Sequence, residues 1–174
     1  RRPGELTYGT SGIATSNHLA MEEVCEKEGV EMTHVPYRGT SENITALLAR
    51  QIDCVANSNS WAPNVEAGQL RLLAVWTRER LGAFPNAPTL RDLGYDMVVT
   101  SPYGITGPKG LDPEITEFLH QAFKKTQHHP LVQEYMKKHD LPNEYLGPAD
   151  YTQFARERAV YEERMVARLK LSID

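Results

Sequence analysis

The stretch YGTSGIATSNHLA, residues 8–20, joins a candidate strand to a candidate helix through a loop of glycine and hydroxyl residues. The Ser and Thr residues of this loop are typical helix caps, so a helix is expected to begin at its end. Gly9 and Gly12 allow the backbone to approach a ligand closely or to adopt positive φ. Because free amides and the helix dipole point toward such a loop, these neutral groups together favour an anion-binding site.

The same loop lacks the residues of several sharper motifs. Ile13 stands where a GxSxG nucleophile elbow requires glycine, and the loop has neither a P-loop lysine nor a GxGxxG pattern. Ser11 and His18 leave a serine hydrolase open as an alternative, although the sequence offers no obvious acidic partner for His18. An ordinary helix cap and a packing histidine explain the same residues without a ligand.

Two further segments follow predicted strands and carry similar side chains. In VPYRGTSENITALL, residues 35–48, a turn at Gly39 and Thr40 again opens a helix, and Tyr37 precedes it. In ANSNSW, residues 56–61, Asn57 follows a strand, either as a ligand contact or in an Asx turn. Loops at the carboxyl ends of neighbouring parallel strands face one crevice, which favours a shared binding site. For Arg38 two interpretations stay open: the guanidinium pairs with a carboxylate, or it is an ordinary solvated side chain in a turn.

The pattern along the chain predicts an α/β fold for the first hundred residues. Strands are expected at 6–9, 31–37, 52–58 and 70–76; helices at 16–28, from 41, at 63–67 and, short, within 80–96. After residue 110 only helices are expected, beginning near 112, 130 and 149. The apolar faces of these helices must pack on the first part or on a lobe outside this chain.

Composition and charge exclude several classes of protein. The 174 residues carry a net charge of -4 with no basic stripe, which argues against nucleic acid, and no apolar run is long enough to span a membrane. Cys25 and Cys54 show no metal or disulfide spacing, so two buried, reduced thiols are expected. The histidines form no metal-binding set, and no cofactor is indicated. The abrupt start, RRPGELTYG, suggests a piece of a longer protein.

Five segments resemble, in order and spacing, the solute receptors of tripartite tricarboxylate transporters, the Bug family. They are PGELTYGTSGIATSNHLAMEE, HVPYRGTSENITALLARQID, VEAGQLRLLAVWTRER, FPNAPTLRDLGYD and SPYGITGPKGLDPEI. The resemblance implies a periplasmic-binding-protein type II, or Venus flytrap, fold with two α/β lobes. It assigns residues 1–100 to the second lobe and 101–174 to the hinge crossover and the C-terminal helices of the first lobe, with the N-terminal half absent.

The resemblance also implies the binding residues. Its ligand contacts fall on Thr10, Ser11, Gly12, Thr15, Ser16, Asn17, His18, Tyr37, Gly39, Thr40 and Asn57, and its hinge on Ser101 and Tyr103. Where many relatives carry an aspartate before the asparagine of the third loop, this chain has Ala56, so the identity of the acid stays open.

The function that the resemblance implies is capture of a small carboxylate, without catalysis, for delivery to a membrane permease. The protein is then expected in the periplasm. Sensing for a membrane kinase is an alternative use of the same fold. Because the predicted C-terminal helices expose apolar faces, self-association of the chain is also expected.

Overall fold

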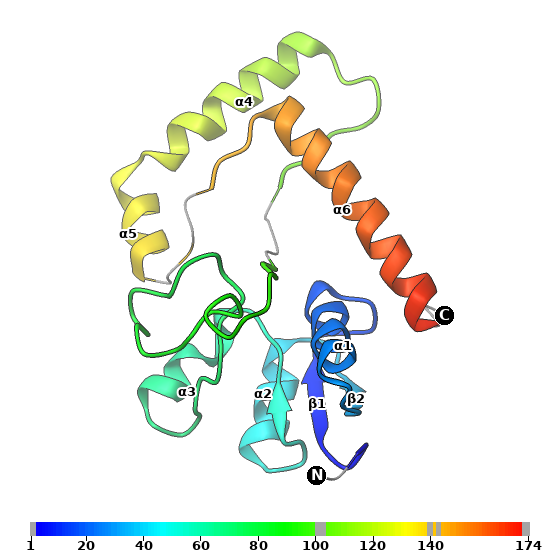
Figure 1. Cartoon of the computed structure of the whole chain (residues 1–174). Coiled ribbons are helices and arrows are strands. Elements are labelled where there is room, and N and C mark those ends of the chain that lie inside the picture. The colour runs from blue at the N-terminus through cyan, green and yellow to red at the C-terminus, as the bar shows by residue number, and fades with distance from the viewer. Residues whose placement is uncertain (1–2, 100–103, 139–140, 142–143, 172–174) are drawn as a thin grey trace. The chain divides into compact units, whose positions relative to one another are not determined.

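The computed structural model describes residues 3–99, 104–138, 141 and 144–171. It divides into two compact units (Figure 1): unit 1 comprises residues 1–100 and 160–174, and unit 2 comprises residues 101–159. Among the described residues, no helix combines the length and apolarity that a bilayer crossing requires.

Unit 1 contains a parallel three-stranded sheet in the order β2-β1-β3, which confirms the predicted α/β fold. The strands are β1 (Thr7–Thr10), β2 (Thr33–Pro36) and β3 (Cys54–Val55). In the register of the sheet, Tyr8 lies opposite His34 on β2 and Cys54 on β3. Pro36 has no N–H to extend the ladder, and β2 ends there as expected.

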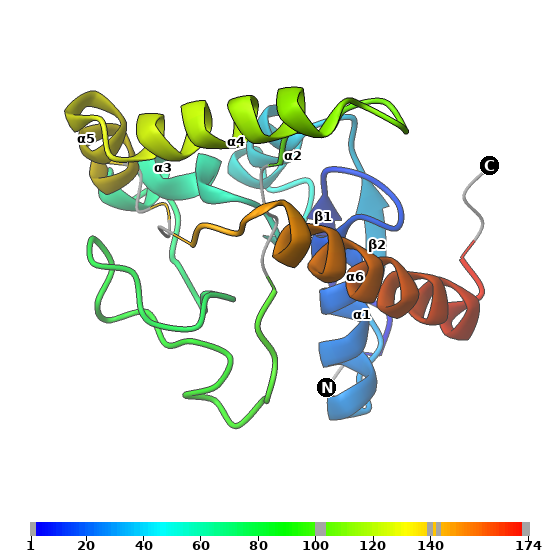
Figure 2. The ribbon, with the colours of Figure 1, turned by 90° about the horizontal axis from the view of Figure 1, so that it is seen from above.

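Helices α1 (Ser16–Glu28) and α2 (Thr40–Leu48) follow the first two strands, as the loops between them predict (Figures 1 and 2). The side chain of Thr15 caps α1, and Gly29 ends it in the left-handed conformation with φ 59°. Helix α2 and the segment that follows it pack so closely on β1 that a Cβ at Gly9 would lie 3.3 Å from Asn43 Cβ in the helix and 2.7 Å from Ile52 Cδ1 beyond it. Glycine at position 9 therefore lets helix and strand meet.

Two predictions for residues 54–99 are wrong. After η1 (Asn59–Trp61) and α3 (Ala62–Glu66), residues 70–76 form no strand, because their ladder contact in the described chain is a single bridge between Val75 and Thr89. The short helix expected within 80–96 is a turn, in which Thr89 and Asp92 bond to each other's backbone and Gly94 ends the run with φ 92°.

These irregular residues nevertheless complete a core on one side of α1. Ala20, Leu90 and Met97 are buried together, and Trp76, Val99 and other half-buried residues pack against them. The Trp76 carbonyl accepts a hydrogen bond from Val99 N at 2.9 Å, which holds the two ends of the segment together.

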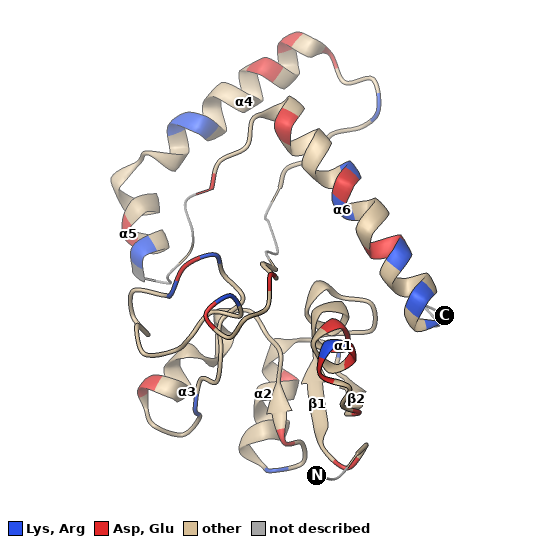
Figure 3. Ribbon diagram, in the orientation of Figure 1, with Lys and Arg blue, Asp and Glu red and all other residues tan. Residues whose placement is uncertain are grey.

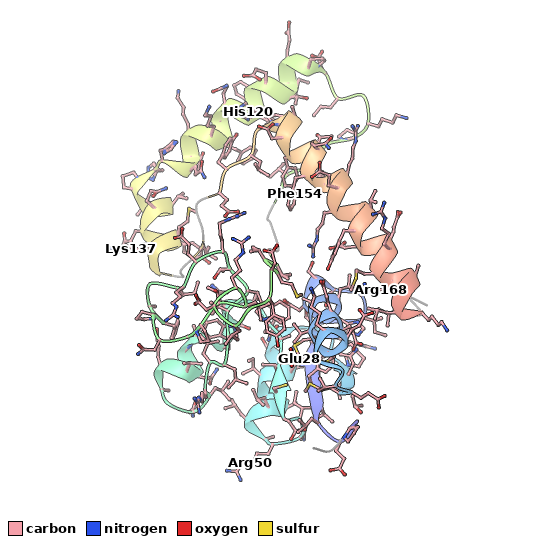
Figure 4. All side chains as sticks on the ribbon, in the orientation of Figure 1. Glu28, Arg50, His120, Lys137, Phe154 and Arg168 are labelled. Carbon is pink, nitrogen blue, oxygen red and sulfur yellow. The ribbon has the colours of Figure 1, made fainter. Side chains whose placement is uncertain are left out.

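The remaining helices are α4 (Pro113–Gln127), α5 (Pro130–Lys138) and α6 (Pro148–Leu169). Asp112 caps α4 as predicted, its carboxylate accepting from Glu114 N at 2.8 Å, with Pro113 in the first turn. Within unit 2, His120 of α4, labelled in Figure 4, is 2.6 Å from the hydroxyl of Tyr145. No residue of α4 is buried, and Phe118 is 73% exposed.

The last ten residues of α6 belong to unit 1 and contact α1 there. Ser16 Oγ donates to Glu162 at 3.3 Å, Tyr161 bonds to Glu23, and Arg168 pairs with Glu26 at 2.8 Å. Met165, between these polar contacts in the sequence, is buried. Charges of both signs alternate along α6 (Figure 3), so polar contacts with acidic residues of α1 are available on successive turns.

Candidate functional site

Three loops gather at the carboxyl edge of the sheet in unit 1. Because the strands are parallel, the residues after Thr10, Pro36 and Val55 leave the sheet on the same side. Two backbone bonds tie the loops to β1, from Tyr37 N to Thr10 O at 3.0 Å and from Ala56 N to Gly9 O at 2.9 Å. The predicted meeting of these loops at one edge is therefore confirmed.

The first loop, residues 10–15, is held by its own hydroxyl groups. Thr10 Oγ1 donates to Gly12 O at 2.9 Å, and Thr15 Oγ1 donates to the same carbonyl at 3.0 Å. Gly12 N returns a bond to Thr10 Oγ1 at 3.3 Å. Gly12 has φ 149° and Ala14 has φ 57°, so two residues of this short loop adopt positive φ. Ser11, which precedes Gly12, is half-buried.

The first turn of α1 presents its amides at the end of this loop. Thr15 Oγ1 accepts from His18 N at 3.4 Å, while Ser16 and Asn17 are half-buried and provide further N–H groups of the first turn. The partial positive charge of the helix dipole adds to these donors. From Leu6 to Met21 the chain carries no Lys, Arg, Asp or Glu, so this positive potential comes from neutral groups (Figure 3).

The second loop brings the N-terminus of α2 to the same edge. Gly39 precedes the helix in an extended conformation, and Thr40 is its first residue. The carboxylate of Glu42 reaches back to Arg38 N at 3.2 Å, which fixes the turn. Tyr37 is half-buried, and a Cβ at Gly9 would lie 3.2 Å from its ring, so the tyrosine packs against the end of β1.

The third loop contributes an amide pair. Asn57 Nδ2 donates to Asn43 Oδ1 at 2.7 Å and is 3.5 Å from Thr40 O. Asn43 is fully buried, and Asn43 Nδ2 and Asn57 Oδ1 are buried without a protein partner. A buried donor and a buried acceptor on two hydrogen-bonded amides favour bound water or ligand groups that satisfy them. The sequence did not identify Asn43, which lies inside α2 where its spacing resembles that of a core residue.

His18 lies beneath the first loop rather than on its surface. The residue is 2% exposed, and its Nδ1 accepts from Ala14 N at 3.0 Å. The expectation that it has no acidic neighbour is wrong, because Glu22, one turn along α1, places Oε1 3.7 Å from Nε2. Burial lowers the pKa of His18, and the Glu22 carboxylate partly opposes that shift.

Tyr8, which is buried, and His34, which is half-buried, complete a cluster around His18 that the sequence did not reveal. The rings of His18 and His34 stack with centroids 3.7 Å apart, and Tyr8, fully buried, lies 4.9 Å from His34. His34 Nε2 is 2.7 Å from Thr10 Oγ1, and the Tyr8 hydroxyl donates to Glu22. The strand register places His34 opposite Tyr8, but a single sequence does not show this register.

Burial governs ionisation throughout this cluster. It lowers the pKa of His34 to about 4, with the neighbouring His18 adding to the shift. It also raises the pKa of Tyr8 together with the bond to Glu22, and raises the pKa of the Cys54 thiol to about 11. Both histidines are therefore neutral at neutral pH. Cys25 is buried, Cys54 is half-buried, and both are free thiols.

Among the described residues, no group of three or more His, Cys, Asp or Glu is arranged to hold a metal ion. The proposed hinge residues Ser101 and Tyr103 lie outside the described residues.

Comparison with known proteins identifies the family. The sequence model of the tripartite tricarboxylate transporter family receptor, TctC, matches residues 1–171. The chain belongs to this family. Its members are solute-binding receptors and not enzymes, so the serine hydrolase alternative falls away. The UPF0065 protein in gbd 5'region of Cupriavidus necator is 45% identical over 170 residues, which cover 98% of this chain and 52% of the relative.

Two solved structures of similar proteins have the same fold. An R. palustris protein solved with adipate is 25% identical, with a TM-score of 0.85, and the match covers 95% of this chain and 56% of that one. MatC from Rhodopseudomonas palustris, solved with malate, is 21% identical with a TM-score of 0.76, covering 94% and 57%. The chain thus spans about half the length of the relatives it matches.

Proposed function

We propose that the three-loop edge of unit 1 binds a small di- or tricarboxylate in a receptor that serves a tripartite transporter. The observation that carries this proposal is the convergence of two helix N-termini and a hydroxyl-rich loop at the carboxyl ends of parallel strands. Such an edge offers hydrogen-bond donors to an anion without a counter-charge. The adipate and malate bound by the two R. palustris relatives support the choice of ligand class.

The contacts in this proposal come from all three loops. Thr10, Ser11, Gly12, Thr15, Ser16 and Asn17 supply hydroxyls and amides of the first loop and helix; Tyr37, Gly39 and Thr40 supply the second, and Asn57 the third. His18 acts from below, since its ring is covered. Asn43 joins the group through its unpaired Nδ2 beside Asn57.

The chain supplies one side of the site in this proposal. Residues 1–100 form the second lobe, residues 101–174 form the crossover and the returning helices of the first lobe, and an N-terminal half completes the receptor. Two observations support this division: the chain spans about half of its relatives, and α4 exposes an apolar face. Closure of the two lobes then favours the bound state, and the closed receptor docks on membrane permease subunits in the periplasm.

Calorimetry with adipate, malate and citrate tests the proposal. The ligands are titrated into the 174-residue chain and into the chain joined to the N-terminal half of the C. necator relative. We expect micromolar binding of at least one acid by the joined protein and weak or no binding by the chain alone. Replacing Ser11 and Thr15 by Ala should weaken binding at least tenfold, because both are first-loop hydroxyls.

The matched control is Thr45→Ala, which removes an exposed hydroxyl of α2 that bonds within its own helix. An equal loss in this variant would show that the first loop has no special role. Absence of binding by the joined protein with every acid at millimolar concentration would overturn the proposed function.

A further inference from the structure

The stacked histidines lie directly beneath the first loop and hold it at two points. His18 comes from α1 and His34 from β2, with an angle of 16° between the ring planes. His18 Nδ1 accepts from Ala14 N at 3.0 Å, and His34 Nε2 contacts Thr10 Oγ1 at 2.7 Å. The two rings thus bond to opposite ends of the segment that carries Ser11 and Gly12.

The hydrogen bonds fix which nitrogen of each ring carries the proton. Thr10 has one hydroxyl proton and gives it to Gly12 O, so Thr10 Oγ1 accepts from His34, whose proton is on Nε2. His18 accepts at Nδ1, so its proton is on Nε2, facing Glu22 Oε1 at 3.7 Å. His18 can accept its loop bond only as a neutral imidazole. His34 donates from Nε2–H in either protonation state, and its pKa, lowered by burial and by His18, keeps it neutral at neutral pH.

The groups around the pair favour this neutral state in one ring more than in the other. Tyr8 of β1 faces both rings, and Glu22 of α1 faces His18. Two thiols, Cys25 of α1 and Cys54 of β3, lie near Tyr8. From α6, Glu162 bonds to Ser16 beside the loop. Glu22 is the acidic group facing His18, whereas burial and the neighbouring His18 both lower the pKa of His34, to about 4.

We infer that His18 and His34 are positioning residues, which hold the binding loop in shape as neutral rings and release it when the pair takes up a proton. A proton on His18 Nδ1 abolishes the acceptor of Ala14 N, a residue already at positive φ. A proton on His34 places a cation 3.7 Å from the stacked ring of His18. The inference rests on the proposed function, since it makes carboxylate binding at this loop sensitive to acid.

The size of the effect follows from linkage between proton uptake and loop release. With a pKa of about 4 in the ordered loop and an ordinary value of about 6.5 once released, acidification to pH 5.5 favours release by up to about tenfold. Above pH 7 both forms are neutral and the effect vanishes. Ligand affinity should therefore fall by up to this factor.

The first test uses the 174-residue chain without ligand. A pH titration by NMR follows the ring signals of His18 and His34 and the backbone amides of Gly12 and Ala14. We expect both rings to titrate below the ordinary histidine range, His34 near pH 4, and the two amides to shift with the same midpoints as the rings. Loop amides that stay unchanged while the rings titrate would overturn the inference.

The second test compares adipate binding at pH 8 and pH 5.5 in the joined protein. His34→Gln keeps a donor near the position of Nε2 but does not titrate, so its affinity ratio between the two pH values should be up to about tenfold smaller than that of the wild type. His129→Gln removes an exposed histidine of unit 2 and should retain the wild-type ratio. Comparing variants at the same pH cancels the protonation of adipate itself.

The two tests separate the inference from the proposed function. Equal ratios in wild type and His34→Gln overturn the inference and leave carboxylate binding intact. If the joined protein binds no adipate while the loop amides still follow the histidines, the positioning role is supported and adipate as the ligand fails. If His34→Gln does not fold, the wild-type titration still decides the inference.

Discussion

The two units differ in where their apolar side chains lie. In unit 1, Leu19 is fully buried and Ile44 is 7% exposed, whereas in unit 2, Phe118 is 73% and Leu131 69% exposed. Unit 1 encloses a core within this chain, because α1 and the segment 74–99 cover each other's apolar side chains. The helices of unit 2 instead present a face of the kind that packs on another structure. Unit 1 therefore buries apolar side chains within the chain itself, whereas the helices of unit 2 leave theirs exposed.

The largest expected effect is a truncation inside unit 1. Leu19→Ala should lower the free energy of unfolding by about 2–5 kcal/mol, because it leaves a cavity beneath α1 at a fully buried position. Denaturant unfolding followed by circular dichroism measures the change. A loss below about 1 kcal/mol would mean that the core of unit 1 is looser than its burial indicates.

The next effect tests the close packing around Gly9 of β1. Gly9→Ala should destabilise the chain by about 1–3 kcal/mol, because its Cβ would lie 3.2 Å from the Tyr37 ring and 3.3 Å from Asn43 Cβ while Ile52 Cδ1, at 2.7 Å, must move away. Gly39→Ala is the control, since a Cβ there meets nothing within 4 Å and the backbone is extended. Equal stability of the two variants in thermal unfolding would contradict this packing.

A smaller effect concerns how the stability of unit 1 depends on pH. Burial lowers the pKa of His34 to about 4 in the folded chain, so below about pH 6.5 the unfolded chain binds a proton that the folded chain does not. Stability of unit 1 should then fall by at most about 1.4 kcal/mol per pH unit as the pH drops from 6.5 toward 4. Urea unfolding at several pH values should give a flatter curve for His34→Gln and an unchanged one for His129→Gln.

The smallest effect on stability belongs to the exposed face of unit 2. Phe118→Ser should change the free energy of unfolding by less than about 0.5 kcal/mol, because the ring is 73% exposed. The same change should reduce self-association of the chain, which light scattering measures. A strictly monomeric wild type would remove the expectation that this face seeks a partner.

Local signals in the sequence predict the elements around the site well. The cap at Thr15 and the C-terminal Gly29 predict both ends of α1, and Pro36 predicts the end of β2. These features are local because each depends on one residue and its immediate backbone. The convergence of the loops also follows, since parallel strands place their carboxyl ends together.

The failures depend on contacts between distant residues. The apolar run at 70–76 has the composition of a strand, but a strand requires a partner, and the described chain provides one bridge to Thr89. The pairing of His18 with His34 depends on sheet register and on the path of α1, neither of which one sequence encodes locally. The sequence does not point to Asn43, because its role depends on the hydrogen bond that it accepts from Asn57 in another loop.

The two cysteines of unit 1 have a consequence for oxidation chemistry. Thiolates, not thiols, attack disulfides and oxidants, and burial raises the pKa of Cys25 and raises that of Cys54 to about 11. At neutral pH, Cys54 is therefore ionised in only about one molecule in ten thousand. A chain that keeps both sulfurs protonated in this way resists mixed-disulfide formation even in an oxidising compartment, without any bridge between them.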